Sequence, residues 1–313
     1  MNTNLPRVIA RDPKTNPRQG EIRWNPAKSL WIFGMTAAAL IGCPFSIRPD
    51  TMIVAFLLTV LTLCVGHSVG MHRLLIHQSF RTPLWVERIL VHLGVLVGMG
   101  GPFGMMRLHD LRDWAQRHPH CHPFFIHRAP WWKDAWWNLH CDLELRHPPE
   151  LQPQKKAIED PYYQFLEKTW RWQQLPLALL LGLFGGWPWI LWGICLRIPL
   201  SLTGHWLIGH LAHPRQNDRA GLQPWLLKGH AVQGANVAGL GLLTMGEAWH
   251  NNHHAFPESA RLGLEHTQRD PGWWVICLLQ KLGLADHIQL PETLPPRPER
   301  TRNKPAPEQK EHP

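Results

Sequence analysis

The chain has 313 residues, of which 44% are hydrophobic, and its formal net charge is +9 at pH 7. This hydrophobic content is enough for a large core, while a mean hydropathy of −0.22 would by itself be typical of a soluble protein. The basic residues flank apolar segments and form no single stripe, which argues against a nucleic-acid-binding protein. The distribution of the apolar residues along the chain therefore decides between a soluble protein and a membrane protein.

Four apolar segments follow a basic N-terminal segment at residues 1–28. A membrane-spanning helix needs about 20 mostly apolar residues, and we predict four such helices at residues 29–47, 51–70, 168–186 and 187–210. The first is too long for a signal peptide and lacks a cleavage site after it. We expect an all-α integral membrane protein.

Arginine and lysine are abundant before the first predicted span and in the connection from 72 to 167, whereas the two short turns between spans carry little charge. The positive-inside tendency therefore predicts that both termini and the long connection are cytoplasmic. Within that connection, residues 84–106 predict an in-plane or re-entrant helix, and the tryptophan-rich residues 130–140 are typical of a helix at the level of the lipid headgroups. These helices would form a cytoplasmic cap.

Most of the histidines fall in four short clusters, at residues 72–77, 118–122, 205–213 and 250–254. In the last cluster, WHNNHH, the histidines at i, i+3 and i+4 share one face of a helix. Neutral imidazole is the commonest metal ligand, so this density predicts a polynuclear metal site. The predicted topology brings all four clusters to the cytoplasmic side, where they can meet beneath one cap.

Other cofactor chemistries lack support in the sequence. The six cysteines are scattered and form no CxxC pair, which argues against zinc ribbons, redox dithiols and iron–sulfur motifs. The chain also has no phosphate-binding glycine loop and no internal repeat. Soluble di-iron bundles use glutamates and Glu-x-x-His pairs, and only Glu247 approaches that pattern.

Two of the clusters resemble the first and last histidine boxes of membrane fatty acid desaturases. They are HRLLIHQSF after GHSVGM, and GEAWHNNHHAFP near the C-terminus. The resemblance covers residues 29–285. It implies two iron ions, dioxygen, and insertion of a double bond into a long acyl chain. We expect one desaturase-like domain at 29–290 and a disordered tail at 291–313.

The resemblance assigns a role to most of the clustered residues. It implies these metal ligands: His72, His77, His118, His122, His210, His213, His250, His253 and His254. Carboxylates at Glu247, Asp110 and Asp113 are candidates for fixing the ligand imidazoles. His67 and His205 are further candidates near the metals, and Trp114 is the candidate substrate contact.

The middle boxes depart from the family pattern. Three residues after Trp114 the family shows HxxHH, but here Cys121 replaces the central histidine. A Cys121 thiolate binds metal, His120 reaches the site in its place, or that ligand is missing. In the fourth span Gly209 stands where many relatives have asparagine, with His210 beside it, and Arg197 is expected to pair with a buried acceptor.

Two other functions stay open at this point. Another membrane di-iron oxygenase, such as a lipid or alkane hydroxylase or a carotenoid-modifying enzyme, would need similar ligands. A membrane metal carrier or sensor would instead spread its ligands through the spans. For a desaturase, the acyl chain can be carried by CoA or by a membrane lipid. No haem motif HPGG is present, so the electron donor would be a separate ferredoxin, rubredoxin or cytochrome.

Overall fold

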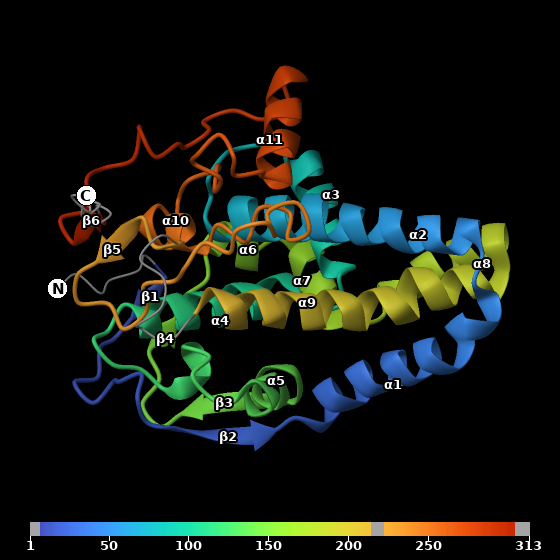
Figure 1. The fold of residues 1–313 in the computed structure, drawn as a ribbon, viewed down its shortest axis with the longest axis horizontal. Coiled ribbons are helices and arrows are strands. Elements are labelled where there is room, and N and C mark those ends of the chain that lie inside the picture. Colours follow the sequence, from blue (N-terminus) through green and yellow to red (C-terminus); the bar gives the residue numbers. More distant parts are fainter. Residues whose placement is uncertain (1–6, 214–221, 304–313) are drawn as a thin grey trace, which may run out of the picture.

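A computed structural model describes residues 7–213 and 222–303, and the described chain is mostly helical (Figure 1). Its helices are α1 (Pro26–Gly42), η1 (Cys43–Ser46), α2 (Pro49–Val60), η2 (Leu61–Ile76), α3 (Leu84–Val95), α4 (Pro102–Gln116), η3 (Pro123–Phe125), α5 (Trp131–His140), α6 (Lys155–Ile158), α7 (Pro161–Thr169), α8 (Gln174–Ile190), η4 (Leu191–Leu196), α9 (Arg197–Ala212), α10 (His250–Ala255) and α11 (Pro271–Lys281). Its strands are β1 (Val8–Ile9), β2 (Gly20–Trp24), β3 (Cys141–Leu145), β4 (Glu150–Leu151), β5 (Trp225–Leu227) and β6 (Arg300–Arg302).

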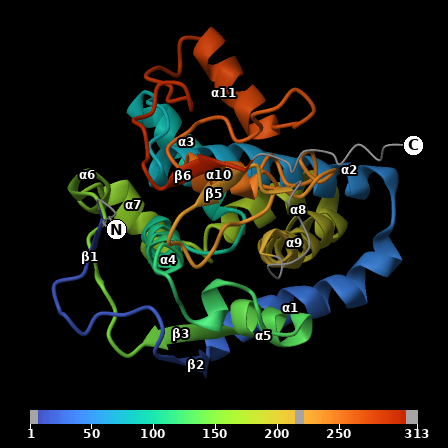
Figure 2. The same cartoon turned by 60° about the vertical axis from the view of Figure 1, so that its left-hand side comes forward.

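The strands pair as three short antiparallel sheets, β1 with β4, β2 with β3 and β5 with β6. The prediction of an all-α fold is therefore corrected, because the described chain also contains these short strands. The sheets lie at the end of the molecule opposite the turns after α1 and within α8 (Figure 1). Figure 2 shows β5, β6 and α10 close together, with β2, β3 and α5 on the other side of α4.

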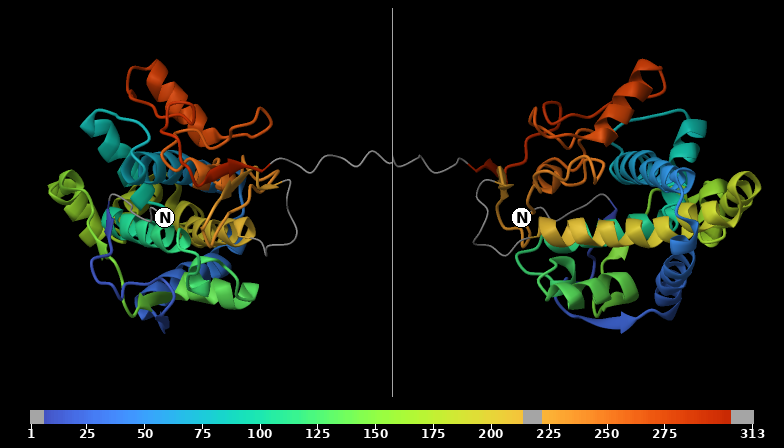
Figure 3. Two further views of the ribbon diagram at one scale, coloured as in Figure 1. Left: turned by 90° about the vertical axis from the view of Figure 1, so that its left-hand side faces the viewer. Right: turned by 45° about the vertical axis from the view of Figure 1, so that its right-hand side comes forward.

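Three helical stretches are long and apolar enough to cross a membrane, at Pro26–Ser46, Pro49–Ile76 and Gln174–Ala212. Many of their large apolar side chains are exposed in the isolated chain, as expected of residues that face lipid. Examples are Leu40, Phe45, Phe56, Leu179, Leu183 and Phe184. Viewed from the side, the α9 part of the third stretch runs beside α2 (Figure 3).

The third stretch changes direction inside α8. Gly186 has φ +68° and ψ −166°, a backbone conformation that residues other than glycine rarely adopt. Pro188 lies two residues further along the chain. The sequence prediction divided the chain into two spans at this glycine. In the structure the part before Gly186 is short, about 18 Å for the twelve residues from Gln174 to Gly185.

Glycines allow η2 and α3 to pack with their backbones almost in contact. A Cβ at Gly66 would lie 2.3 Å from the carbonyl carbon of Leu93, and one at Gly70 would lie 2.4 Å from the carbonyl oxygen of Leu90. Close backbone approach through small residues is a common way to pack helices within membranes. This packing fixes the end of η2, which carries the first pair of site histidines.

Arg197 is fully buried within the apolar helices. Its guanidinium donates to the carbonyl oxygens of Gly193 and Leu96 at 2.7 and 2.8 Å, and to Thr62 and Gln174 side chains at 3.2 and 3.0 Å. These bonds satisfy a charge that would be costly in hydrocarbon. The predicted pairing of Arg197 with buried acceptors is confirmed.

Both chain ends are tied to the helical core in the described residues. Arg7 forms a bidentate pair with Asp110 at 2.7 and 2.8 Å and donates to the carbonyl of Ile76 at 2.7 Å. Near the other end, β6 pairs with β5, and Arg297 donates to the carbonyl of His254 at 3.1 Å. Of the predicted tail at 291–313, the structure describes residues 291–303, with β6 among them, whereas residues 304–313 lie outside the described chain.

Candidate metal centre

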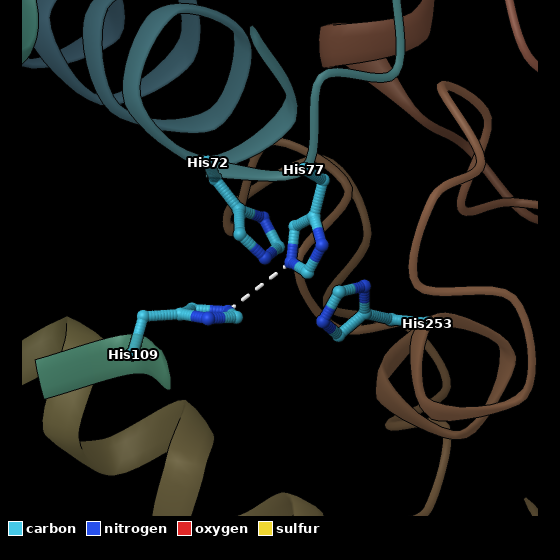
Figure 4. Close-up of side chains that lie close together, drawn as sticks. All are labelled: His72, His77, His109 and His253. Carbon is cyan, nitrogen blue, oxygen red and sulfur yellow. Dashed lines mark hydrogen bonds between the residues drawn. The ribbon is translucent and has the colours of Figure 1, made fainter. Parts of the chain in front are cut away.

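Four imidazoles from three helices converge at the end of η2 (Figure 4). One nitrogen from each lies within 4.8 Å of the others. They belong to His72, His77, His109 and His253, the four-histidine group. The Nε2 atoms of His77 and His109 are 3.2 Å apart.

A wide helical turn explains how two histidines five residues apart share this site. Residues separated by five in an α-helix point about 140° apart. At the end of η2 the amide of His77 bonds the carbonyl of His72 at 3.0 Å, which is an i to i−5 bond of the π-helical type. The two rings therefore lie on one side, with centroids 4.8 Å apart.

Glu247 fixes the ring of His72. Its Oε2 lies 2.9 Å from Nδ1 of His72, at an angle outside that of a regular hydrogen bond, and its Oε1 accepts from Ser68 at 2.5 Å. Burial raises the pKa of Glu247, but the adjacent His72 and Arg73 lower it by more, so its net pKa is well below the usual range. A carboxylate beside one ring nitrogen leaves the other free for a metal. The structure thus gives Glu247 the supporting position that the sequence suggested.

Three further imidazoles form a neighbouring group. His213 at the end of α9 meets His250 and His254 of α10, and one nitrogen of each lies within 4.8 Å of the others. Nδ1 of His213 donates to the carbonyl of Gly209 at 2.6 Å, which directs its Nε2 into the group. We call these residues the three-histidine group.

One helix supplies both groups. Adjacent residues of a helix point about 100° apart, so His253 enters the four-histidine group while His254 enters the three-histidine group. The ring centroids of His253 and His254 are 5.9 Å apart. The two groups are therefore neighbours.

The nitrogen separations fit metal ligation. Two nitrogens that bind one ion at about 2.1 Å are about 3.0 Å apart at a right angle and about 3.4 Å apart at a tetrahedral angle. The Nε2 atoms of His77 and His109 are 3.2 Å apart, and those of His250 and His254 are 2.9 Å apart. Both pairs could therefore hold first-row metal ions, which is also the preference of imidazole ligands.

Burial favours the neutral form of most of these imidazoles, which is the form that binds metal. It lowers the pKa of six of them well below the ordinary value of 6.5, and neighbouring histidines lower it further. They are His77, His109, His213, His250, His253 and His254.

The metal-free protein should lose stability on acidification. As the pH falls below about 6.5, histidines of the unfolded chain take up protons that the folded chain binds only at lower pH. The free energy of unfolding therefore decreases from pH 7.5 to pH 5.5. Thermal unfolding of the chelator-treated protein in detergent measures this. A midpoint independent of pH over this interval would contradict the buried, neutral state of the groups.

A third group surrounds the buried carboxylate of Asp134. Its Oδ2 accepts from Nδ1 of His127 at 2.8 Å, Nδ1 of His210 at 2.9 Å and the indole of Trp206 at 2.8 Å. Arg112 donates to Nε2 of His127 at 2.9 Å. Burial raises the pKa of Asp134, but these donors lower it more, so the carboxylate is ionised. Three donors on one oxygen and a nearby guanidinium favour a hydrogen-bonded network over a cation site.

His210 therefore lies in a different place from the one predicted. Its ring faces Asp134 and does not join the three-histidine group. The side chain of His127 occupies the space beside Gly209. A Cβ added at Gly209 would lie 3.2 Å from Nε2 of His127. The ring centroids of His127 and His213 are 5.1 Å apart, so the Asp134 network contacts the three-histidine group through His127.

The cluster at residues 118–122 does not reach either histidine group. Nδ1 of His118 donates to the carbonyl of Trp114 at 2.8 Å, and Nδ1 of His122 accepts from the amide of Phe124 at 3.2 Å. His120 is exposed. The chain turns away after α4 ends at Gln116, so the structure gives no support to His118, His122 or His120 as ligands.

Cys121 packs against apolar neighbours of the Trp114 core and is outside the metal groups. Burial raises the pKa of its thiol to about 12, so it is not a thiolate. Cys121→Ser should leave the iron content unchanged and cost about 1 kcal/mol of stability, as near-isosteric changes do. Metal analysis and thermal unfolding of the purified variant check this. A sharp loss of iron would show that Cys121 is a ligand.

The other candidates have structural contacts. Asp110 is paired with Arg7 and not with an imidazole, because it points toward the N-terminal segment. Trp114 is 1% exposed within an aromatic core, which leaves it no surface for substrate. His67 and His205 contact each other within the membrane helices, with ring centroids 5.0 Å apart, and join none of the three groups.

Sequence reasoning did not propose His109 as a ligand, and it did not single out His127 or Asp134. His109 stands outside the HPHCH cluster. The sequence signal for the position of His109 is the start of the helix that carries it. Gly101-Pro102 is a typical helix start, and it places His109 in the second turn. Asp134 and His127 have no local motif that points to each other, because they meet across the turn between η3 and α5.

The chain is similar to known proteins over most of its length. Residues 50–276 match the sequence model of the family described as fatty acid desaturase. The chain is 34% identical to the sn-1 stearoyl-lipid 9-desaturase of Anabaena variabilis over 86% of this chain and 95% of that protein. It is 31% identical to the sn-2 palmitoyl-lipid 9-desaturase of Nostoc sp. (strain 36), over 85% and 92%. It is 30% identical to the acyl-CoA C20 Delta5-desaturase of Anemone leveillei, over 87% and 85%.

Proposed function

Because this chain belongs to the fatty acid desaturase family, and is thus a membrane oxidoreductase that desaturates fatty acyl chains, we propose that it works with two irons. One would be held by the four-histidine group and the other by the three-histidine group. The observation that carries this proposal is the pair of neutral imidazole groups that share α10. Iron is the metal of the family, and imidazole ligands suit it.

The net reaction balances with dioxygen and two electrons. R–CH2–CH2–R′ + O2 + 2 e− + 2 H+ gives R–CH=CH–R′ + 2 H2O. Iron and dioxygen supply the oxidising power to remove hydrogen from an unactivated methylene, which no amino-acid side chain has. The protein's own residues fix the orientation of the imidazoles: Glu247 holds the ring of His72, and the carbonyl of Gly209 holds that of His213.

We propose four membrane segments, with the long third helix counted as two because it is interrupted at Gly186. The basic residues before α1 and in the connection after η2 favour a cytoplasmic face for both termini and for the metal groups. In this arrangement residues 29–290 form the catalytic domain. The strands of residues 7–28 and 291–303 brace its cytoplasmic side.

The substrate we propose is a long acyl chain held by a membrane lipid or by CoA. Relatives with both kinds of name match the chain at similar identity. The two electrons would come from a separate carrier protein such as a ferredoxin, rubredoxin or cytochrome. Apolar side chains on the outside of the membrane helices would lie beside acyl chains in the bilayer.

Lipid profiling of cells that express the chain tests this proposal. The expected product is an acyl chain with one new double bond, absent from cells that express the His253→Ala variant. Separate analysis of membrane lipids and acyl-CoA during a short pulse shows in which pool the product first forms. A product that gains one oxygen and keeps its hydrogens would identify a hydroxylase instead.

A further inference from the structure

An open apolar groove follows α1, and none of the histidines of the metal groups lines it. Its volume is about 390 Å³, within the range of about 300–1,000 Å³ that is typical of ligand sites. Apart from Arg171, the residues that line it are apolar, and most of them belong to α1. Figure 1 shows α1 at the edge of the helical bundle, where such a groove would open to the bilayer. We call it the α1 groove.

The length of the α1 groove matches one leaflet of a membrane. Its lining residues on α1 extend from Ala27 to Ala38, a rise of about 16 Å along the helix axis. The hydrocarbon core of a bilayer is about 30 Å thick, so one leaflet accounts for about 15 Å. Between these residues Gly34 leaves the groove open, because a Cβ there would meet nothing within 4 Å. An acyl chain fits this length, whereas the spanning helix of a partner protein would continue through the other leaflet.

Arg171 places a positive charge at the headgroup end of the α1 groove. It lies in the turn between α7 and α8, three residues before the apolar stretch Gln174–Ala212 begins. The first groove residue on α1, Ala27, likewise stands at the beginning of its apolar stretch, Pro26–Ser46. Arginine at the end of a membrane helix normally reaches the level of the lipid headgroups.

Aromatic rings hold the guanidinium of Arg171 without neutralising its charge. Its carbon lies 4.1 Å from the ring centroid of Trp170 and 5.9 Å from that of Trp31. Its Nε is buried and has no hydrogen-bond partner among the described residues. Burial lowers the pKa of Arg171, and no carboxylate of the described chain raises it.

The arrangement of Arg171 suits a phosphate group. A ring stacked on the flat face of a guanidinium leaves the N–H donors at its edge available. Those donors bind phosphates and carboxylates through paired hydrogen bonds. At the level of the headgroups, the phosphate of a membrane lipid is the group at hand, and its acyl chains enter the apolar region that the groove occupies.

We propose that the α1 groove binds one anionic membrane lipid, with an acyl chain beside Gly34 and the headgroup phosphate paired with Arg171. The apolar wall accounts for the acyl chain, and the unpaired cation at its end accounts for the anionic headgroup. This site is separate from the metal groups, so it does not depend on the proposed two-iron function.

Native mass spectrometry of the full-length protein tests this site. The protein is reconstituted in nanodiscs with equal amounts of phosphatidylglycerol and phosphatidylcholine that carry the same acyl chains, and it is then released into detergent. The wild type should retain one phosphatidylglycerol per chain, about fivefold more often than phosphatidylcholine, whose choline cation opposes Arg171. Arg171→Gln should abolish this preference. Gly34→Leu should lower retention of both lipids, because its side chain fills the groove.

Two variants are matched controls. Lys168→Gln removes the same charge from an exposed residue of α7 that does not line the groove. Gly204→Leu adds the same side chain to α9, at another glycine whose Cβ would meet nothing within 4 Å. Both variants should retain lipid as the wild type does.

An unchanged lipid preference in Arg171→Gln would overturn this assignment, as would full lipid retention by Gly34→Leu or a wild type that retains no lipid. If the wild type is a dimer and Gly34→Leu is a monomer with its lipid still bound, a second copy of the chain occupies the groove instead. If Gly34→Leu does not fold, Ala38→Leu on the same groove is judged by the same criteria.

Discussion

His109→Ala is expected to remove the iron of the four-histidine group and to lower desaturation by at least about 100-fold, more than the loss typical of residues outside the ligand set. The reason is the position of His109 in this group, with its Nε2 3.2 Å from that of His77. Iron content and product formation of the purified variant measure the effect.

His118→Ala and His122→Ala are matched controls for this prediction. Both remove an imidazole from the same part of the chain, but their rings bond to the backbone at Trp114 and Phe124. Both variants should keep their iron. If they lose it while His109→Ala retains it, the second histidine box lies at residues 118–122, as the sequence suggested.

His253→Ala is expected to abolish activity, again by at least about 100-fold, because a direct ligand contributes more than an outer partner. Its ring lies 4.6 Å from that of His72 and 4.8 Å from that of His77, so it closes the four-histidine group. It also lines a small cavity together with His254 of the three-histidine group. Activity and iron content should fall together, while membrane insertion is unchanged because α10 is outside the membrane helices.

His120→Ala provides the comparison for His253→Ala. It removes an exposed imidazole from a histidine-rich segment, and it should leave iron content and activity unchanged. Equal losses in both variants would mean that the effect comes from a general dependence on histidine and not from ligation.

The membrane helices and the outer histidine boxes could be predicted because their signals are local. Long uncharged segments predict the membrane-spanning helices. The spacing of His250, His253 and His254 places three rings near one face of a helix, and His72 and His77 stand at the end of a span. The structure brings these five histidines into the two groups.

The middle of the site could not be predicted in this way, because it depends on contacts between distant segments. The dense HPHCH cluster suggested ligands, but α4 ends before it, and His109 is the α4 residue that joins the four-histidine group. His210 has the right spacing from His213, yet the buried carboxylate of Asp134 binds its ring. Pairing of β6 with β5 likewise orders a proline-rich stretch that composition alone would leave disordered.

The metal content of the wild-type protein tests the two-iron centre most directly. Full-length protein should be purified in detergent from iron-supplied cells and examined by metal analysis and Mössbauer spectroscopy. The two imidazole groups predict close to two irons per chain, in two distinct environments. Zinc is satisfied by four ligands, which the four-histidine group alone could supply. A consistent finding of one zinc, with no activity after reconstitution with iron, would contradict the two-iron centre.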